Sequence, residues 1–188
     1  ATIASDIKQS STTVDVTANL TGDSQQNIGG LVGFADESDI QYGSASGDVT
    51  IIGPEPGIKV GGLVGNVTQG NISDSKAEGM VTGTRALGGL VGEFNRNSAT
   101  TDRYTITNSS ATGDLNGVSR AGGLVGDAVH TTIIGSTASG NITADSVDAG
   151  GLVGFSTNLS VIDSSASGAV TGTEAVGGIV GELQGGTI

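Results

Sequence analysis

The sequence predicts an all-β fold: a parallel β-helix, or β-solenoid, of about six coils, roughly triangular and right-handed. Three observations predict it. One pentapeptide recurs six times, a second block of apolar and small residues recurs in the same phase, and no segment shows the 3.6-residue period of a helix. A period of about 20 to 50 residues is typical of stacked repeats, and parallel crossover connections are usually right-handed.

The pentapeptide is Gly-Gly-Leu-Val-Gly, with Ile in place of Leu in the last copy. Its copies start 32, 27, 34, 28 and 27 residues apart. They are Gly29–Gly33, Gly61–Gly65, Gly88–Gly92, Gly122–Gly126, Gly150–Gly154 and Gly177–Gly181. We expect each copy, together with the apolar residue before it, to form one β piece of a coil, with glycines where the chain turns.

The second block carries Ile, Ser and Ala at offsets 0, 3 and 5, followed by Gly and then Val or a relative. Its copies are Ile40–Val49, Ile72–Val81, Ile106–Leu115, Ile133–Ile142 and Val161–Val170, after a degenerate first copy at Ile7–Val16. The chain is therefore interpreted as one domain, 1–188, with repeats at 7–39, 40–71, 72–105, 106–132, 133–160 and 161–187. Ile188 falls on the first position of a seventh copy.

Each period thus supplies three short β pieces: this block, a Val-Thr pair or its relatives, and the pentapeptide piece. Identical positions in successive coils would stack at the parallel strand spacing of about 4.8 Å. We expect two buried ladders, one of pentapeptide leucines and one of the residues that open the second block. Their members are Leu31, Leu63, Leu90, Leu124, Leu152 and Ile179, and Ile40, Ile72, Ile106, Ile133 and Val161.

The pentapeptide piece is apolar on both faces, because Leu31 shares parity with Ala35, and Val32 shares parity with Ile28 and Phe34. Two interpretations remain open. Either an exposed valine ladder is tolerated, or an apolar strip packs on another layer or molecule.

Composition excludes several function classes. The net charge is −12, and the seven basic residues are scattered, so neither nucleic-acid binding nor attachment to anionic lipid is expected. The chain has no cysteine, which excludes disulfides and thiolate metal sites. No apolar run approaches 18 residues, so no membrane insertion is expected.

Three insertions separate the copies, and solenoid function tends to lie in such insertions. Residues 17–27 and 50–59 lengthen the same corner of adjacent coils, and residues 93–105 add seven residues to another. The last insertion mixes aromatic and basic side chains and is the candidate ligand loop, with an ordinary solvated loop as the alternative. Its candidate residues are Phe94, Arg96, Asp102, Arg103 and Tyr104.

Six of the ten asparagines open an Asn-x-Ser/Thr sequon. These candidate N-glycosylation sites are Asn19, Asn66, Asn71, Asn108, Asn141 and Asn158. The alternative is that Asn, Ser and Thr co-occur because all three form turns.

No catalytic residue, cofactor or metal is predicted. His130 has no Gly-x-Ser-x-Gly elbow to accompany it and is expected in a solvent-exposed loop, and no Lys-Ser/Thr follows the glycine pairs. Asp15, Asp48 and Asp114 share one ladder position, which other residues interrupt.

The repeated pentapeptide, followed seven residues later by Ile and then by Ser-x-Ala-x-Gly-x-Val, resembles the GLUG-motif repeat family. The resemblance implies a bacterial or archaeal β-solenoid of the cell surface or secreted fraction. Such repeats occur in adhesins and in non-catalytic regions of immunoglobulin-A-cleaving proteases. The family has no catalytic residues to transfer to this chain.

We therefore expect a non-catalytic, extracellular structural and adhesive module of a surface fibre or stalk. The first alternative is an accessory region of a larger secreted protease or other surface enzyme. A second is ice binding through a threonine ladder, which only two Thr-x-Thr pairs support, at Thr82 and Thr171. The start at Ala1, without methionine or signal peptide, indicates a processed form or an excised fragment. Expected partners are further coils, through self-association along the axis or flanking repeats, and a surface protein or glycan.

Overall fold

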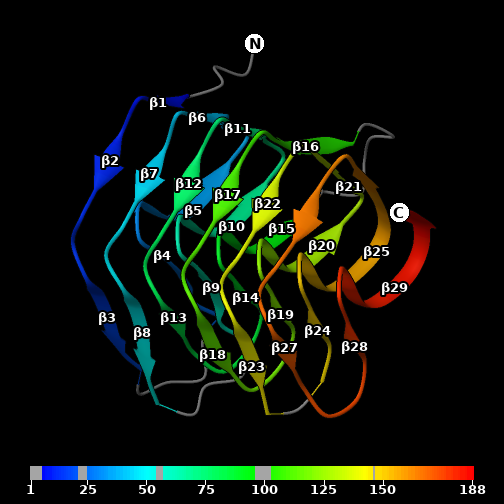
Figure 1. The fold of residues 1–188 in the computed structure, drawn as a ribbon. Helices are drawn as coiled ribbons and strands as arrows, with labels where there is room; N and C mark the ends of the chain where they lie inside the picture. The colour runs from blue at the N-terminus through cyan, green and yellow to red at the C-terminus, as the bar shows by residue number, and fades with distance from the viewer. Residues whose placement is uncertain (1–5, 21–24, 54–56, 96–102, 146) are drawn as a thin grey trace.

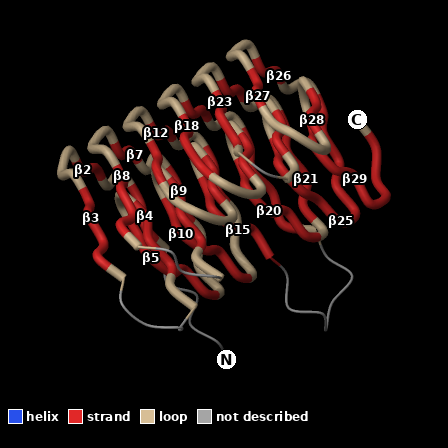
Figure 2. The backbone as a smooth tube through the Cα atoms, turned by 90° about the horizontal axis from the view of Figure 1, so that it is seen from below, coloured by secondary structure: helices blue, strands red, loops and turns tan. Residues whose placement is uncertain are grey.

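The structure, a computed structural model, describes residues 6–20, 25–53, 57–95, 103–145 and 147–188. These residues form the predicted all-β solenoid of parallel strands, stacked from the N-terminal layer to the C-terminal layer (Figure 1). The described residues contain no helix, and thus no helix long and apolar enough to cross a membrane. Figure 2 shows the same turns from below as a regular stack.

Three of the four sheets, which we call B, C and D, each stack six short strands. Sheet B contains β2 (Ser11–Thr12), β7 (Ser44–Ala45), β12 (Lys76–Ala77), β17 (Ser110–Ala111), β22 (Thr137–Ala138) and β26 (Ser165–Ala166). Sheet C contains β3 (Val16–Asn19), β8 (Val49–Ile52), β13 (Val81–Thr82), β18 (Leu115–Gly117), β23 (Ile142–Ala144) and β27 (Val170–Thr171). Sheet D contains β4 (Asn27–Gly29), β9 (Lys59–Gly61), β14 (Leu87–Gly88), β19 (Ala121–Gly122), β24 (Ala149–Gly150) and β28 (Val176–Gly177).

Sheet A has 11 strands in two rows. Its first row contains β1 (Ile7–Lys8), β6 (Ile40–Gln41), β11 (Ile72–Ser73), β16 (Tyr104–Thr107) and β21 (Thr131–Ile134). Its second row contains β5 (Val32–Asp36), β10 (Val64–Thr68), β15 (Val91–Asn95) and β20 (Val125–Val129). The long strand β25 (Val153–Ile162) pairs with both rows, and β29 (Val180–Thr187) pairs with β25.

A full period therefore holds five strands, where the sequence predicts three pieces. The first piece divides between sheets A and B, and the pentapeptide piece divides between sheet D and the second row of sheet A. Sheets B, C and D each have six layers, so about five turns separate the first layer from the last.

Both predicted ladders are confirmed. Each pentapeptide leucine donates its N–H to the carbonyl of the leucine or isoleucine in the next coil, at 2.8–3.0 Å in all five steps. The isoleucine ladder is in register, for example Ile72 opposite both Ile40 and Ile106. The ladder side chains are buried, apart from the half-buried Leu31 and Ile179 in the end layers.

The predicted possibility of an exposed valine ladder is wrong. Val64, Val91, Val125 and Val153 are all fully buried, in the same apolar core as the leucines. The pentapeptide turns toward the interior of the coil, so its Leu and Val side chains both enter this core. The second core is separate and lies between sheets C and D.

Glycine at the turn is what allows the two cores to lie so close. A Cβ on Gly62 would lie 2.2 Å from the Gly89 carbonyl oxygen and 3.0 Å from the Cβ of Ala77, on sheet B. The equivalent glycine meets the equivalent alanine in all the other coils except the last, as with Gly123 and Ala138. No other residue fits there, because Cβ atoms do not approach backbone this closely. The turn therefore packs directly against sheet B and divides the interior of the coil into two cores.

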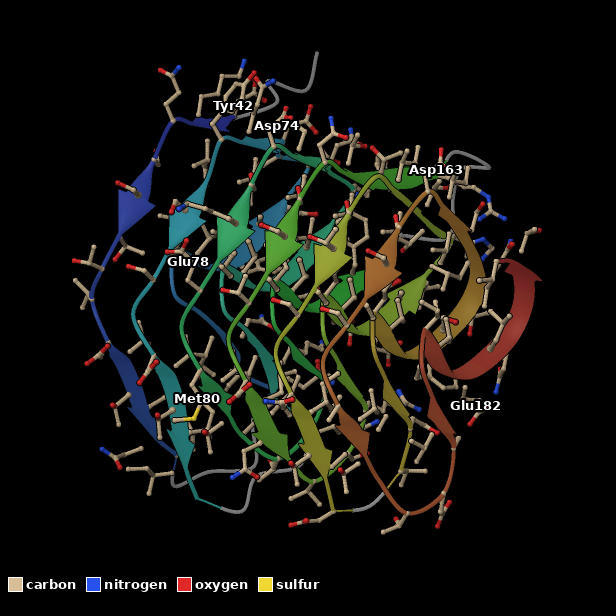
Figure 3. All side chains as sticks on the ribbon, viewed as in Figure 1. Tyr42, Asp74, Glu78, Met80, Asp163 and Glu182 are labelled. Carbon is tan, nitrogen blue, oxygen red and sulfur yellow. The ribbon has the colours of Figure 1, made fainter. Side chains whose placement is uncertain are left out.

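A serine ladder supports the corner between sheets A and B. The backbone there has positive φ in every coil, for example 56° at Tyr42, 50° at Asp74 and 48° at Asp163, and these residues follow one edge of the molecule (Figure 3). The next residue is usually a serine whose hydroxyl donates to its own coil and accepts from the preceding one. Ser109, for example, donates to the Thr107 carbonyl at 2.9 Å and accepts from the Ser75 N–H at 3.2 Å. These bonds hold backbone conformations that side chains otherwise disfavour.

The close contact between the pentapeptide turn and sheet B predicts that the same Gly→Ala substitution has a large effect on stability in an inner coil and a small one in the last layer. Gly123→Ala should lower the free energy of unfolding by about 3 kcal/mol or more, because its Cβ would overlap Gly151 and Ala138. Gly178→Ala, at the same repeat position in the last layer, should change it by less than about 1 kcal/mol, because apart from its chain neighbours no described residue has an atom within 4 Å of the added Cβ. Urea unfolding of both variants tests this, and equal losses would contradict the close contact.

Candidate functional site

The three insertions contribute to one charged cavity, which we call the side cleft. It has a volume of about 340 Å³ and lies between sheet D and the second row of sheet A. Gln25 comes from the first insertion, Gly57, Ile58 and Lys59 from the second, Glu93 and Asn95 from the third, and Arg85, Ala86, Arg120 and Asp127 from the repeats. The basic residues look scattered in sequence, but three of the six that the structure describes line this cleft.

The pentapeptide turn positions both walls of the side cleft. A Cβ on Gly92 would lie 2.4 Å from the Val60 nitrogen and 2.8 Å from the Lys59 carbonyl carbon. Because glycine has no side chain, the second row of sheet A approaches sheet D of the preceding coil backbone to backbone. Side chains farther from the turn then meet across the cleft.

Ion pairs cross the side cleft. Lys59 Nζ lies 3.4 Å from Glu93 Oε1, and these side chains are only 15% and 17% exposed. Arg120 Nη1 pairs with Asp127 Oδ2, and its Nε lies 3.8 Å from Asp148 Oδ2. The Arg120 guanidinium also lies over the Phe155 ring, 4.2 Å from its centroid. These contacts hold Arg120 in one orientation.

Asp127 is the most constrained group in the side cleft. Its Oδ1 is buried and has no hydrogen-bond partner among the residues that the structure describes, although Arg120 holds Oδ2. Burial raises the pKa of the Asp127 carboxyl, while the nearby Arg120 charge opposes that rise. Burial, followed by the Glu182 carboxylate, also raises the pKa of Asp148. Asp127 therefore places a largely buried and incompletely paired carboxyl group in the lining of the cleft, and Asp148 lies behind it on the other side of Arg120 as a second Arg120 partner.

The predicted ligand loop is only partly a surface feature. Phe94 is 1% exposed and packs in the apolar core, so its interpretation as a ligand contact is wrong. Tyr104 is half-buried against the same core. Arg103 is exposed and donates to the Asn158 carbonyl at 2.9 Å, while Arg96 and Asp102 lie outside the described residues.

The sequons fall into three groups. Asn19, Asn108 and Asn141 are exposed. Asn66 is 7% exposed, so the folded protein cannot carry a glycan there. Asn71 and Asn158 are half-buried, and their side-chain amides are hydrogen-bonded, as is that of the exposed Asn141.

His130 and the interrupted aspartate ladder have structural roles. His130 is half-buried rather than solvent-exposed, and its Nδ1 lies 3.0 Å from Asn158 Nδ2. Asp48 accepts the Met80 N–H at 2.8 Å, and Asp114 accepts the Asn141 N–H at 2.7 Å. Each carboxylate thus bonds the backbone of the next coil. Within the described ranges, no three His, Cys, Asp or Glu residues group as metal ligands do.

Comparison with protein families gives a match to the GLUG motif at residues 24–50, 57–82 and 145–171. Each matched segment contains one pentapeptide and the strands that follow it as far as sheet C. This chain is a GLUG-repeat β-solenoid. The other three GLUG pentapeptides hold the same ladder positions in the structure, although an insertion follows one of them. No curated protein and no solved structure matched the chain.

Asp127 predicts a pH dependence of stability. A carboxyl whose folded pKa is raised stabilises the fold when protonated, and that contribution is lost as pH rises from about 4 toward the folded pKa. Asp127→Asn should therefore lose less stability than the parent chain between pH 4 and pH 7. Urea unfolding across this range measures the difference, and parallel curves for the two proteins would refute it.

Exposure predicts which sequons can carry glycans. After expression in a glycosylating host, the folded fraction should carry glycan at Asn108 and Asn141 and none at Asn66, where a glycan would have to enter a packed wall. Peptide mapping by mass spectrometry measures this occupancy. A folded fraction glycosylated at Asn66 would contradict the assigned burial.

Proposed function

We propose that this GLUG-repeat solenoid is a non-catalytic structural and adhesive module outside the cell, in a surface fibre or stalk, which associates end to end. The single observation that carries the proposal is the state of the end layers. Leu31 and Val32 in the first layer, and Ile179 and Val180 in the last, are half-buried, whereas their equivalents in inner layers are fully buried.

An end layer that exposes core side chains and open strand edges favours contact with another layer. That layer is either a further repeat of a longer chain or a second copy of this one. The resemblance to GLUG repeats of surface and secreted proteins supports the location, and a net charge of −12 keeps a repetitive surface soluble. A role in adhesion follows, because a long stack presents the same lateral surface many times.

The second candidate is an accessory region of a larger secreted protease or other surface enzyme. The same resemblance favours it, since such repeats occur in non-catalytic regions of these enzymes. Sequence flanking the repeats distinguishes the two, because a His-Glu-x-x-His helix beside the solenoid would support the protease.

The end layers predict concentration-dependent association. Light scattering and electron microscopy of the purified chain should show end-to-end strings that lengthen with concentration. Leu183→Asp should suppress them, because Leu183 is 39% exposed in the last layer and lies opposite Ser156 of the layer below. Strictly monomeric rods at all concentrations would reject association between copies.

Val118→Asp is the matched control. Val118 is 43% exposed on the side of an inner coil, so the same change there should leave the strings intact. If both variants suppress association equally, lateral contacts rather than end layers cause it.

A further inference from the structure

We propose that the side cleft binds an acidic sugar, a hydroxyl-rich ring that carries one carboxylate. The inference concerns a lateral small-molecule site and is independent of end-to-end association. A cavity of about 340 Å³ is in the size range of ligand pockets and suits one or two sugar rings.

The first observation is an acceptor without a donor. Asp127 is 7% exposed and lines the cleft, and its Oδ1 has no hydrogen-bond partner within the described ranges of the chain. A buried acceptor left unpaired is destabilising, so a donor that reaches it binds favourably. Arg120 holds Oδ2 and Oδ1 is fully buried, so a ligand hydroxyl that bonds to Oδ1 has to displace the carboxyl group from its present position.

The second observation is a cation without a direct ion pair. Lys59 and Arg120 are paired with Glu93 and Asp127. Arg85 lines the same cleft and is exposed, and it forms no salt bridge within the part of the chain that the structure describes, although its charge acts on Asp127 from a distance. A guanidinium without a direct partner is well suited to bind a carboxylate through two parallel hydrogen bonds.

The remaining lining selects among ligands that satisfy both groups. A metal cation would face Lys59, Arg85 and Arg120. A small inorganic anion would face the carboxylates of Glu93 and Asp127 and leave Asp127 Oδ1 unpaired. The ammonium of an amino acid would lie beside Arg120. An uncharged hydroxyl avoids that repulsion, and the side-chain amides of Gln25 and Asn95 supply further donors and acceptors.

The test is a titration of the ¹⁵N-labelled chain, followed by NMR, with three acidic sugars: D-glucuronate, D-galacturonate and N-acetylneuraminate. D-Glucose and D-galactose are the neutral partners of the first two, and acetate is the anion without hydroxyls. At least one acidic sugar should shift the amides of Lys59, Glu93 and Asp127, and should bind at least tenfold more tightly than acetate and than its neutral partner where it has one.

Two variants assign the contacts. Arg85→Gln should weaken binding of that acidic sugar by tenfold or more, whereas Arg103→Gln, whose side chain does not line the cleft, should leave it unchanged. Asp127→Asn should also weaken it, with the NMR spectrum confirming that the variant is folded.

Other results overturn the proposal. No shift with any acidic sugar at tens of millimolar would show that the cleft binds none of them. Equal binding of acetate would show a simple anion site, and equal binding of the neutral sugars would show that Arg85 plays no part. None of these outcomes bears on the size distribution of the chain, which tests the proposed function separately.

Discussion

The close approach of the pentapeptide turn to sheet B is the constraint on which the rest of this structure depends. Glycine at the second pentapeptide position brings the chain against an alanine and against the carbonyl of the next coil, distances at which no Cβ fits. This contact divides each coil into two cores and directs both Leu and Val into one of them. The chain therefore fills its interior with branched aliphatic residues and needs few aromatics, which are only 3% of the sequence.

The same constraint produces the side cleft. Turning the pentapeptide inward brings sheet D and the second row of sheet A face to face, with glycine where their backbones meet. Charged residues beyond the glycines are then partly shielded from solvent, as the Lys59–Glu93 pair shows. Buried ion pairs contribute little net stability when their desolvation is counted, so the cleft is a weak means of stabilising the fold. A polar cavity with unsatisfied groups is more useful for recognition.

The sequence predicted the fold class and both ladders, because repeat phase identifies equivalent positions without knowledge of the path between them. Repeat phase did not reveal the direction of the pentapeptide turn. Apolar residues on both faces of a strand fit a strand buried between two cores, and they fit equally well a strand with one core face and one exposed apolar face. The sequence analysis did not predict the cleft, because it compared the repeats at their apolar positions and not at their charged ones. A signal was present: Lys59, Arg120 and Asp148 each lie two residues before a pentapeptide, and Glu93, Asp127 and Glu182 lie five residues after its first glycine. Phe94 was misassigned because its repeat position, held by the core residue Val67 in the coil before, was counted as part of the insertion.

Native-state hydrogen exchange tests the central role of the pentapeptide turn most directly. The amides of Leu63, Leu90 and Leu124 bond to the next coil at the turn and should exchange only through global unfolding. The amides of Asp74 and Asn108, at the exposed corner, are also bonded between coils but should exchange earlier through local opening. Leucine amides that exchange as early as these corner amides would show that the turn is not the constraint that holds the coils together.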